Sequence, residues 1–184
     1  MPGFTIHLAV AKKYVEKHKN EIKNEIEFYK GTIRPDTNED FTDICKNKVK
    51  THYGIMGNNN DGNFDCHIEK FLIDSNTDLK KDFYKGYLLH LLTDYYFYTK
   101  YFNKELLDVI KNNDKFYYDY DCINKDLEDK YKITYIININ KFVAYNVGVP
   151  KYLKLDKIIN FIEDFSNINL KDEIKKWQQL NLHN

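Results

Sequence analysis

The sequence predicts an all-α fold, a single-domain helical bundle formed by all 184 residues. Apolar residues recur at helical spacing along most of the chain, and no stretch of any extent alternates apolar and polar residues as a half-buried strand does. Residues 86–101 are apolar almost all the way round, which is typical of a helix that runs through the middle of a domain. The length suits one domain, since a chain of this size buries roughly 70% of its unfolded surface.

The first half of the chain is expected to contain helices separated by turn-forming segments. Pro35 breaks the helical pattern and favours an extended Arg34, so residues 31–37 are expected to form a loop. The expected elements are a helix capped by Thr5 that runs to about Lys19, a helix from Glu21 to Lys30 that ends at Gly31, a short helix within 38–50, a long loop over 51–63, a helix over 65–74, and the central helix capped by Asp78.

The second half is also expected to be helical. The expected helices cover residues 103–112, 121–131, 136–146, 156–165 and 170–182, with a break at Val147–Pro150. Residues 135–139 are rich in β-formers and offer a short strand as the alternative.

The composition indicates which partners and which cellular compartment to expect for this protein. The 28 basic and 28 acidic residues balance, so no net field favours a nucleic acid or an anionic membrane. Cys45, Cys66 and Cys122 are odd in number and form no Cys-x-x-Cys pair, so we expect reduced core thiols. The N-terminus does not resemble a signal peptide, and no segment reaches the roughly 20 apolar residues of a transmembrane helix. We therefore expect a soluble, cytoplasmic protein without a transmembrane segment.

Two polar residues interrupt the apolar central stretch. His90 and Asp94 are four residues apart, so on a helix their side chains leave the same face one turn apart. A carboxylate is rarely buried without a partner, because desolvation of its charge costs several kcal/mol. We therefore expect a partner opposite Asp94. Gly86, one turn before His90, is expected to let a loop or a substrate approach.

Further imidazoles and carboxylates occur at expected helix starts and in loops. Taken singly, each has an ordinary role, as a surface or packing histidine or as an aspartate in a turn. Together they form the ligand type that holds Zn²⁺ or Mn²⁺ with a position open for water. The candidate metal ligands are His7, Asp36, His52, His90 and Asp94.

The order of these residues resembles the zinc-dependent phospholipase C family, in its short intracellular branch. The matching motifs are Met-Pro-Gly-Phe-x-x-His over residues 1–7, Gly-x-x-x-Pro-Asp over 31–36, the His of Thr-His-Tyr-Gly over 51–54, and Gly-Tyr-x-x-His-x-x-x-Asp over 86–94. They cover the first half of the chain in the family's order. The second half adds only its helical class to the resemblance.

The resemblance implies a metal-dependent hydrolase with one or two zinc ions, Mn²⁺ being possible. Asp36, His52, His90 and Asp94 would hold one ion, and Asp94 would bridge to a second ion held by His7. Two cations about 3.5–4 Å apart can clamp a phosphate and lower the pKa of a bound water. The implied reaction is attack by metal-bound hydroxide on a small-molecule phosphoester, either a phosphodiester or a phospholipid-like or nucleotide-like substrate.

Two residues of one loop are candidates for catalysis. Asp36 can accept the proton of the nucleophilic water. Arg34 can contact a phosphate oxygen, or it can be an ordinary solvated arginine.

The sequence departs from the family where its secreted members place further His and Glu ligands beyond the aspartate. Residues 95–98 are Tyr-Tyr-Phe-Tyr, so a third ion is not expected. His67 is the spare imidazole, and a structural or exposed role is its ordinary interpretation. Tyr87 and Tyr98 either orient a ligand through their hydroxyls or belong to the core.

Two other functions stay open. The loss of the downstream ligands favours a catalytically inactive binding or regulatory protein in which the metal is a structural staple. A phosphohydrolase of the HD type is less consistent with the sequence, because that superfamily is marked by an adjacent His-Asp pair and this chain has none.

Overall fold

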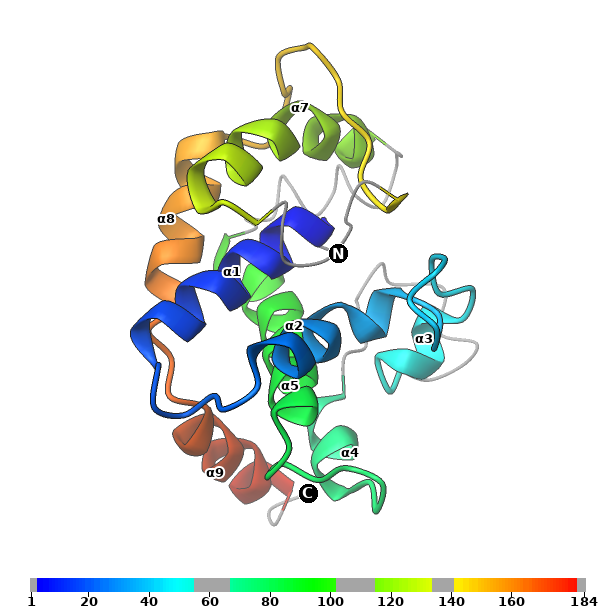
Figure 1. Cartoon of the computed structure of the whole chain (residues 1–184), viewed down its shortest axis with the longest axis vertical. Helices are drawn as coiled ribbons and strands as arrows, with labels where there is room; N and C mark the ends of the chain where they lie inside the picture. The colour runs from blue at the N-terminus through cyan, green and yellow to red at the C-terminus, as the bar shows by residue number, and fades with distance from the viewer. Residues whose placement is uncertain (1–2, 55–66, 102–114, 134–140, 182–184) are drawn as a thin grey trace.

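The helices of this protein are arranged around one central helix, as a computed structural model shows for residues 3–54, 67–101, 115–133 and 141–181 (Figure 1). The elements are α1 Phe4–Lys17, α2 Glu25–Ile33, the 3₁₀ turn η1 Arg34–Asp36, α3 Lys48–Thr51, α4 Ile68–Ile73, α5 Asp82–Tyr96, the π-helical turn η2 Phe97–Tyr101, α7 Lys115–Tyr131, α8 Leu155–Phe165 and α9 Leu170–Asn181. The described residues form no strand, and Thr37 and Ile44 make an isolated β-bridge. The predicted all-α class is confirmed.

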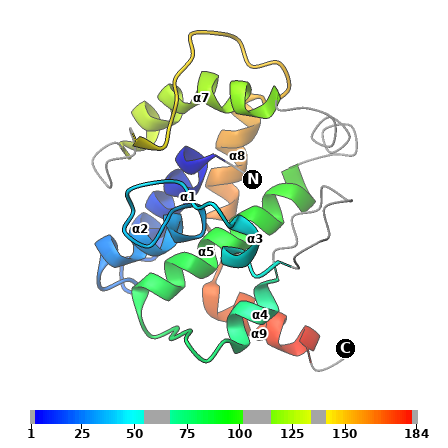
Figure 2. The same ribbon diagram turned by 90° about the vertical axis from the view of Figure 1, so that its right-hand side faces the viewer.

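Helix α5 runs through the middle of the molecule, with α1 and α2 beside it, α7 at one end and α4 and α9 at the other (Figures 1 and 2). Helix α1 packs against α2, α5, α7 and α8, and α4 packs against α9. Buried side chains from these helices form one contiguous hydrophobic core. No described helix has both the length and the apolar character that crossing a bilayer requires.

The closest helix pair is α2 and α5, whose backbones meet through two glycines. A Cβ atom added to Gly31 would lie 1.8 Å from the carbonyl oxygen of Phe83, and one added to Gly86 would lie 2.0 Å from that of Phe28. Only glycine fits at either position, because any side chain would displace a main chain. Gly31 therefore lies inside α2, not at its end, and Gly86 admits helix α2 and not a loop or a substrate.

Helix α1 begins two residues earlier than expected. Gly3 occupies the N-cap position, and Thr5 is buried within the first turn. The hydroxyl of Thr5 donates a hydrogen bond to the side chain of Asn124 in α7. Thr5 thus joins two helices and does not cap its own.

The start of α5 is set by Asp82 and not by the expected cap, Asp78. The carboxylate of Asp82 accepts hydrogen bonds from the backbone N–H groups of Lys23 and Asn24, at 2.8 and 2.7 Å, and pairs with Lys85 at 2.7 Å. Asp78 lies in the preceding turn. The first turn of α5 is thereby tied to the chain just before α2.

In the second half, α7 begins at Lys115 and not at residue 121 as expected. The segment that packs beside α7 also differs from the prediction. Residues 143–147 are not helical, because polar groups of α7 bind their backbone: Asn124 donates to the carbonyl of Ala144 at 2.9 Å, and the N–H of Asn146 donates to the carbonyl of Asp121 at 3.0 Å. The predicted helix 136–146 is therefore wrong over its described part. The predicted break at 147–150 is confirmed, whereas helix 103–112 and the alternative strand 135–139 lie outside the described residues.

Two more predictions need correction. Of the expected helix within 38–50, only the last residues belong to a helix, α3, because the side chain of Asn38 accepts hydrogen bonds from the N–H groups of Thr42 and Asp43 and closes a turn. The thiols of Cys45 and Cys122 are free but half-buried, so neither lies in the core. Cys66 lies outside the described residues.

Candidate metal centre

The fold brings the five predicted ligands together. His7 comes from α1, Asp36 from η1, His52 from the end of α3, and His90 and Asp94 from α5. All five are buried, with at most 4% of any residue exposed. They form two overlapping groups, His7–His90–Asp94 and Asp36–His52–His90, in which the ligand atoms lie within 4.8 Å of one another. Such groups can hold a metal ion.

Helix α2 fixes the ring of His90. The Nδ1–H group of His90 donates to the carbonyl oxygen of Thr32 at 2.7 Å. This carbonyl lies in the last turn of α2, where carbonyl groups lack partners within their own helix. The contact through Gly31 and Gly86 brings it within reach. The lone pair of His90 Nε2 is therefore directed into the cluster.

The short helix α3 does the same for His52. Its Nδ1–H group donates to the carbonyl of Lys48, one turn earlier, at 2.7 Å. The side chain of Asn47 caps α3 by accepting from the N–H of Lys50 at 3.1 Å. In both histidines a backbone carbonyl thus holds Nδ1, the usual arrangement of histidines that bind a metal through Nε2.

The Nε2 atoms of His52 and His90 lie 3.1 Å apart. One oxygen of Asp94, Oδ2, lies 3.1 Å from Nε2 of His52 and 3.4 Å from that of His90. Two ligand atoms that each lie about 2.1 Å from one tetrahedral ion are about 3.4 Å apart. The three atoms therefore have the spacing of ligands around a common cation, and without a cation or a proton their lone pairs would repel one another.

The second oxygen of Asp94, Oδ1, faces His7, whose Nε2 lies 3.4 Å away. The ring of His7 stacks on that of His90 at a centroid distance of 3.8 Å. Within the described structure, neither nitrogen of His7 and neither oxygen of Asp94 has a hydrogen-bond partner. An imidazole nitrogen can bind only one ion, whereas a carboxylate can bridge two, so Asp94 has the position of a bridging ligand.

The 3₁₀ turn η1 holds Asp36 against α3. The hydroxyl of Thr51 donates to the carbonyl of Pro35 at 2.6 Å, and the N–H of Cys45 donates to the carbonyl of Asp36 at 2.8 Å. Oδ1 of Asp36 lies 3.9 Å from Nε2 of His52. The same oxygen forms an ion pair with Lys48 at 2.7 Å.

The cationic side chain beside the cluster is Lys48, which was not predicted from the sequence. Arg34, which was predicted to contact a phosphate, has other partners. The guanidinium of Arg34 donates to the carbonyl of Thr37 at 2.8 Å and pairs with Glu39 at 3.3 Å, so it braces its own turn. Lys48 was detectable, because it lies four residues before His52 on the same helix. On a helix, residues four apart lie on the same face, so a helix over residues 48–51 would have predicted Lys48 beside His52.

The charges of the cluster follow from its burial and its neighbours. Burial and the adjacent His7 lower the pKa of His90 to about 4, so this imidazole is neutral. Burial would raise the pKa of Asp94, but the neighbouring His90 and the close approach of the His52 imidazole, at 3.1 Å, hold it well below its usual range. Burial likewise opposes ionisation of Asp36, yet His90, Lys48 and His52 lower its pKa.

The pKa of His52 is shifted in the opposite direction to that of His90. Burial lowers the pKa of His52, but the close contact with Asp94 and the charges of Asp94 and Asp36 outweigh that effect and raise it. Two carboxylates and three imidazoles thus meet in a volume from which water is largely excluded. A divalent cation binds such ligands in their deprotonated forms.

Tyr87 and Tyr98, for which the sequence left open a ligand-orienting or a core role, have different surroundings. The hydroxyl of Tyr87 donates to the carbonyl of Thr51, so it holds α3 against α5 as a packing residue. Burial, followed by the charges of Tyr120 and Asp94, raises the pKa of Tyr98 well above its usual range. Burial and then Asp94 act in the same direction on Tyr120. These two phenols therefore stay protonated near the cluster.

The remaining candidates lie elsewhere. His67 pairs through Nδ1 with Glu69 at 2.7 Å at the start of α4, which is a structural role. Tyr95 and Tyr96, where the resembled family has further ligands, pack against α9: the ring of Tyr95 lies 4.9 Å from that of Trp177, and the hydroxyl of Tyr96 donates to Glu173 at 2.9 Å.

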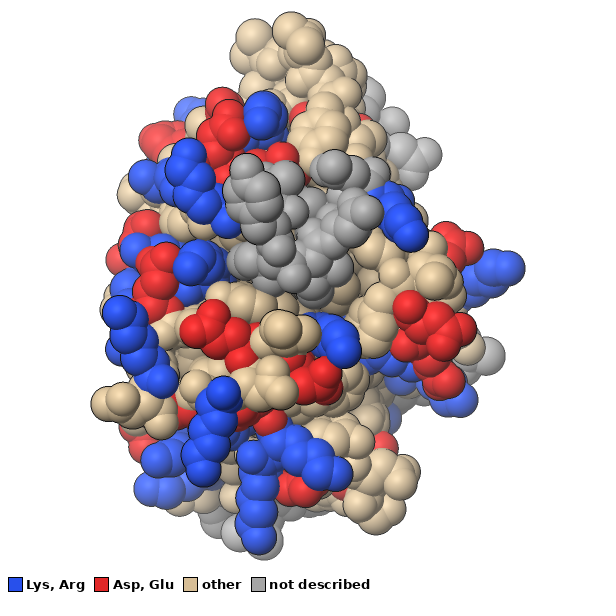
Figure 3. Space-filling model, in the orientation of Figure 1, with Lys and Arg blue, Asp and Glu red and all other residues tan. Residues whose placement is uncertain are grey.

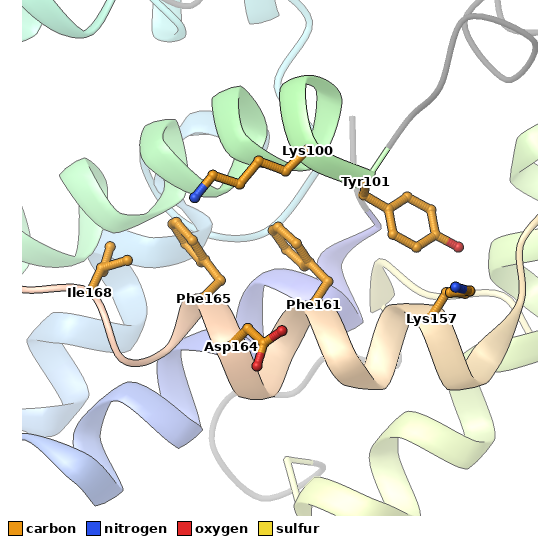
Figure 4. A pocket seen from close by; sticks show the side chains of 7 residues that line it. All are labelled: Lys100, Tyr101, Lys157, Phe161, Asp164, Phe165 and Ile168. Atoms are coloured by element: carbon orange, nitrogen blue, oxygen red, sulfur yellow. The ribbon is translucent and has the colours of Figure 1, made fainter.

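One pocket of the described structure lies outside the cluster, between η2 and α8 (Figure 4). Lys100 and Tyr101 line it from η2, and the stacked rings of Phe161 and Phe165 line it from α8. None of the five clustered residues borders it.

Comparisons with family models, curated proteins and solved structures find no match to this chain. A function for the cluster is therefore inferred from its own residues. What they establish is a buried cluster of three histidines and two aspartates, in which two overlapping groups of three could hold a metal ion.

Proposed function

We propose that the protein is a metal-dependent hydrolase of phosphoesters, similar to the zinc-dependent phospholipase C family. The observation that carries this proposal is the convergence of His52, His90 and Asp94, whose ligand atoms lie 3.1–3.4 Å apart. Both rings are already fixed through Nδ1 by backbone carbonyls. A site of this kind is preorganised for a cation.

Zn²⁺ is the ion we propose, with Mn²⁺ as the alternative, because imidazole and carboxylate ligands suit both. Asp36, His52, His90 and one oxygen of Asp94 would hold the first ion. The other oxygen of Asp94 and His7 would hold a second ion, since each carboxylate oxygen faces a different imidazole.

A bound divalent ion would lower the pKa of a water molecule and neutralise charge on a phosphate. The chain supplies the other groups. Asp36 is ionised and can accept a proton from water. Lys48 contacts Asp36 and has 32% of its side chain exposed, so it can reach a phosphate oxygen at the solvent side of the cluster. Tyr98 is protonated and can donate a hydrogen bond.

Metal analysis combined with a substrate screen tests this proposal. Purified protein would be analysed for Zn and Mn, and then assayed with a phosphodiester, a phosphomonoester and dispersed phospholipid in the presence of each ion. We expect bound metal and turnover of at least one substrate class, both lost in His52→Ala. The matched control is His18→Ala, which removes a histidine outside the cluster. Equal turnover by His52→Ala and the wild type would contradict the proposal.

A second function is favoured by the burial of the five side chains, which leaves little surface for a substrate. In this alternative the ion is a structural staple in a binding or regulatory protein. Bound metal, a melting temperature that falls on chelation, and no turnover of any of the three substrate classes would support it. Metal analysis alone does not separate the two functions, whereas turnover that depends on His52 does.

A further inference from the structure

The loop between α7 and α8 exposes apolar side chains at one end of the molecule. Val147 is fully exposed and Val149 is 84% exposed, and residues 144–149 are all exposed. The loop stands above α7 at the top of Figure 1. In the space-filling view that top carries no charged side chain on the face shown (Figure 3). Exposed valines are costly in water unless something covers them.

Hydrogen bonds from α7 hold the loop in this shape. At its far end the buried carboxylate of Asp119 accepts from the backbone N–H groups of Lys151, Tyr152 and Leu153, at 2.9, 2.6 and 2.9 Å. At its near end Asn124 and the carbonyl of Asp121 bind the backbone of Ala144 and Asn146. Both ends are thus anchored to one helix.

The tip is fixed as well. A Cβ atom on Gly148 would lie 2.2 Å from the hydroxyl of Tyr118 and 3.3 Å from the thiol of Cys122. Glycine at this position lets the chain lie directly on α7, and its two neighbours, Val147 and Val149, are the residues left exposed. The exposure of the valines is therefore a property of an ordered, anchored loop.

The charge of the segment differs from that of the chain as a whole. Residues 141–155 contain three lysines, Lys141, Lys151 and Lys154, and no acidic residue, although the chain as a whole is neutral. All three lysines are exposed. Two exposed tyrosines lie close to the valines: Tyr145 in the loop, and Tyr118 of α7, which lines a surface pocket together with Val149 and contacts Gly148. The segment thus combines exposed valines, exposed phenols and exposed lysines, with no acidic residue of its own.

We propose that this loop is a membrane-contact element that places Val147 and Val149 in the outer part of a bilayer carrying anionic lipids. Tyrosine is enriched where apolar and wet environments meet, and lysines near a membrane surface are attracted by anionic head groups. A second copy of the chain fits less well, because a stable protein interface buries about 800 Å² on each partner and is closely packed, whereas this is a narrow convex tip. The inference does not depend on the metal centre.

Vesicle co-sedimentation of the full chain tests this inference. Vesicles of phosphatidylcholine alone would be compared with vesicles that also contain phosphatidylserine. We expect binding to the mixed vesicles and about tenfold weaker binding by the double variant Val147→Ser, Val149→Ser, because two apolar side chains no longer enter the lipid. Each of Lys141→Gln and Lys151→Gln is expected to weaken binding about fivefold.

The matched control is Ile73→Ser, which removes an exposed aliphatic side chain on α4, at the other end of the molecule. It should bind vesicles like the wild type. Melting temperatures equal to that of the wild type would show that the loop variants are folded. Failure of the wild type to bind mixed vesicles, or unchanged binding by the double valine variant, would overturn the proposal. A dimer that dissociates in the double valine variant would overturn it too, and would assign the loop to self-association.

Discussion

Asp94 and Asp119 are equally buried, at 0% and 1% exposure, yet they have opposite surroundings. Asp119 accepts hydrogen bonds from three successive backbone N–H groups, so its charge is stabilised within the fold. Asp94 accepts no hydrogen bond from the described residues, and each of its oxygens faces an imidazole. Burial alone therefore does not mark a functional carboxylate. The surroundings of Asp94, which faces imidazoles in place of backbone donors, are those of a carboxylate that could bind a metal ion.

Asp82 belongs with Asp119. It is 8% exposed, and it binds two backbone N–H groups and the ammonium group of Lys85. Both aspartates join a helix to a distant segment of the chain, and both are satisfied by the protein itself. Substitutions in the three aspartates should consequently separate into effects on metal and effects on stability.

The largest effect is expected for Asp94→Asn. An amide cannot supply two anionic oxygens, so bound metal should be lost and phosphoester turnover should fall about a thousandfold or more. Metal content and steady-state kinetics measure this. Asp119→Asn is the matched control and should keep its metal. Equal metal content in Asp94→Asn and the wild type would remove Asp94 from the site.

The next effect is expected for Asp119→Ala, which should lower the free energy of unfolding by about 3 kcal/mol. Three N–H groups, one buried and two partly buried, lose a charged acceptor, and each unsatisfied group costs about 1 kcal/mol. Urea unfolding, monitored by circular dichroism, measures the change. The affinity for Zn²⁺ in the folded protein should not change, and a large loss of affinity would show that the two carboxylates are coupled.

Removal of the metal should produce a comparable but reversible effect. An ion that binds only the folded state stabilises it by about 2.7 kcal/mol when its free concentration is a hundred times Kd. Chelation should therefore lower the melting temperature of the wild type, and added Zn²⁺ should restore it. Asp94→Asn should be insensitive to both treatments. A wild-type melting temperature indifferent to chelator would argue against a bound ion.

The smallest effect, about 1 kcal/mol, is expected for Asp82→Asn, and it depends on pH. Burial would raise the pKa of Asp82, but Lys85 and the N–H groups of Asn24 and Lys23 outweigh it and lower the pKa. The folded state thus holds this proton less tightly than the unfolded state, whose pKa is about 3.9. The stabilisation is complete above that value and is lost as pH falls through the lower folded pKa.

Urea unfolding of the wild type and Asp82→Asn at pH 7 and at about pH 3 measures this difference. The gap between the two proteins should shrink at the acidic pH, because the unfolded wild-type chain then takes up a proton that the folded carboxyl holds less tightly. A gap of the same size at both pH values would show that the charge of Asp82 does not stabilise the fold.

The sequence was sufficient to predict the helical class and to select the five clustered residues. Helical periodicity and spacing are local properties of the chain, and His90 and Asp94 are placed on one face by the helix itself. The metal, the reaction and the family remain predictions. They depend on a ligand and a substrate that helical spacing does not specify.

What the sequence could not predict depends on partners distant in the chain. The acceptor for His90 is the backbone carbonyl of Thr32, and a backbone group has no residue-specific signal. Residues 143–147 leave the helical conformation because α7 binds their backbone. Arg34 was predicted from its charge and from its place in the same loop as Asp36, but its guanidinium binds the carbonyl of Thr37 and the carboxylate of Glu39.

The contact of Gly31 and Gly86 has a consequence for how this protein tolerates sequence change. Because the contact joins main chain to main chain, the distance from the carbonyl of α2 to the imidazole of His90 does not depend on the size of any side chain between them. Substitutions that change the size of core side chains elsewhere should therefore leave the position of that imidazole unchanged. Mutational sensitivity is instead concentrated at two positions, where the addition of one methyl group forces the helices apart.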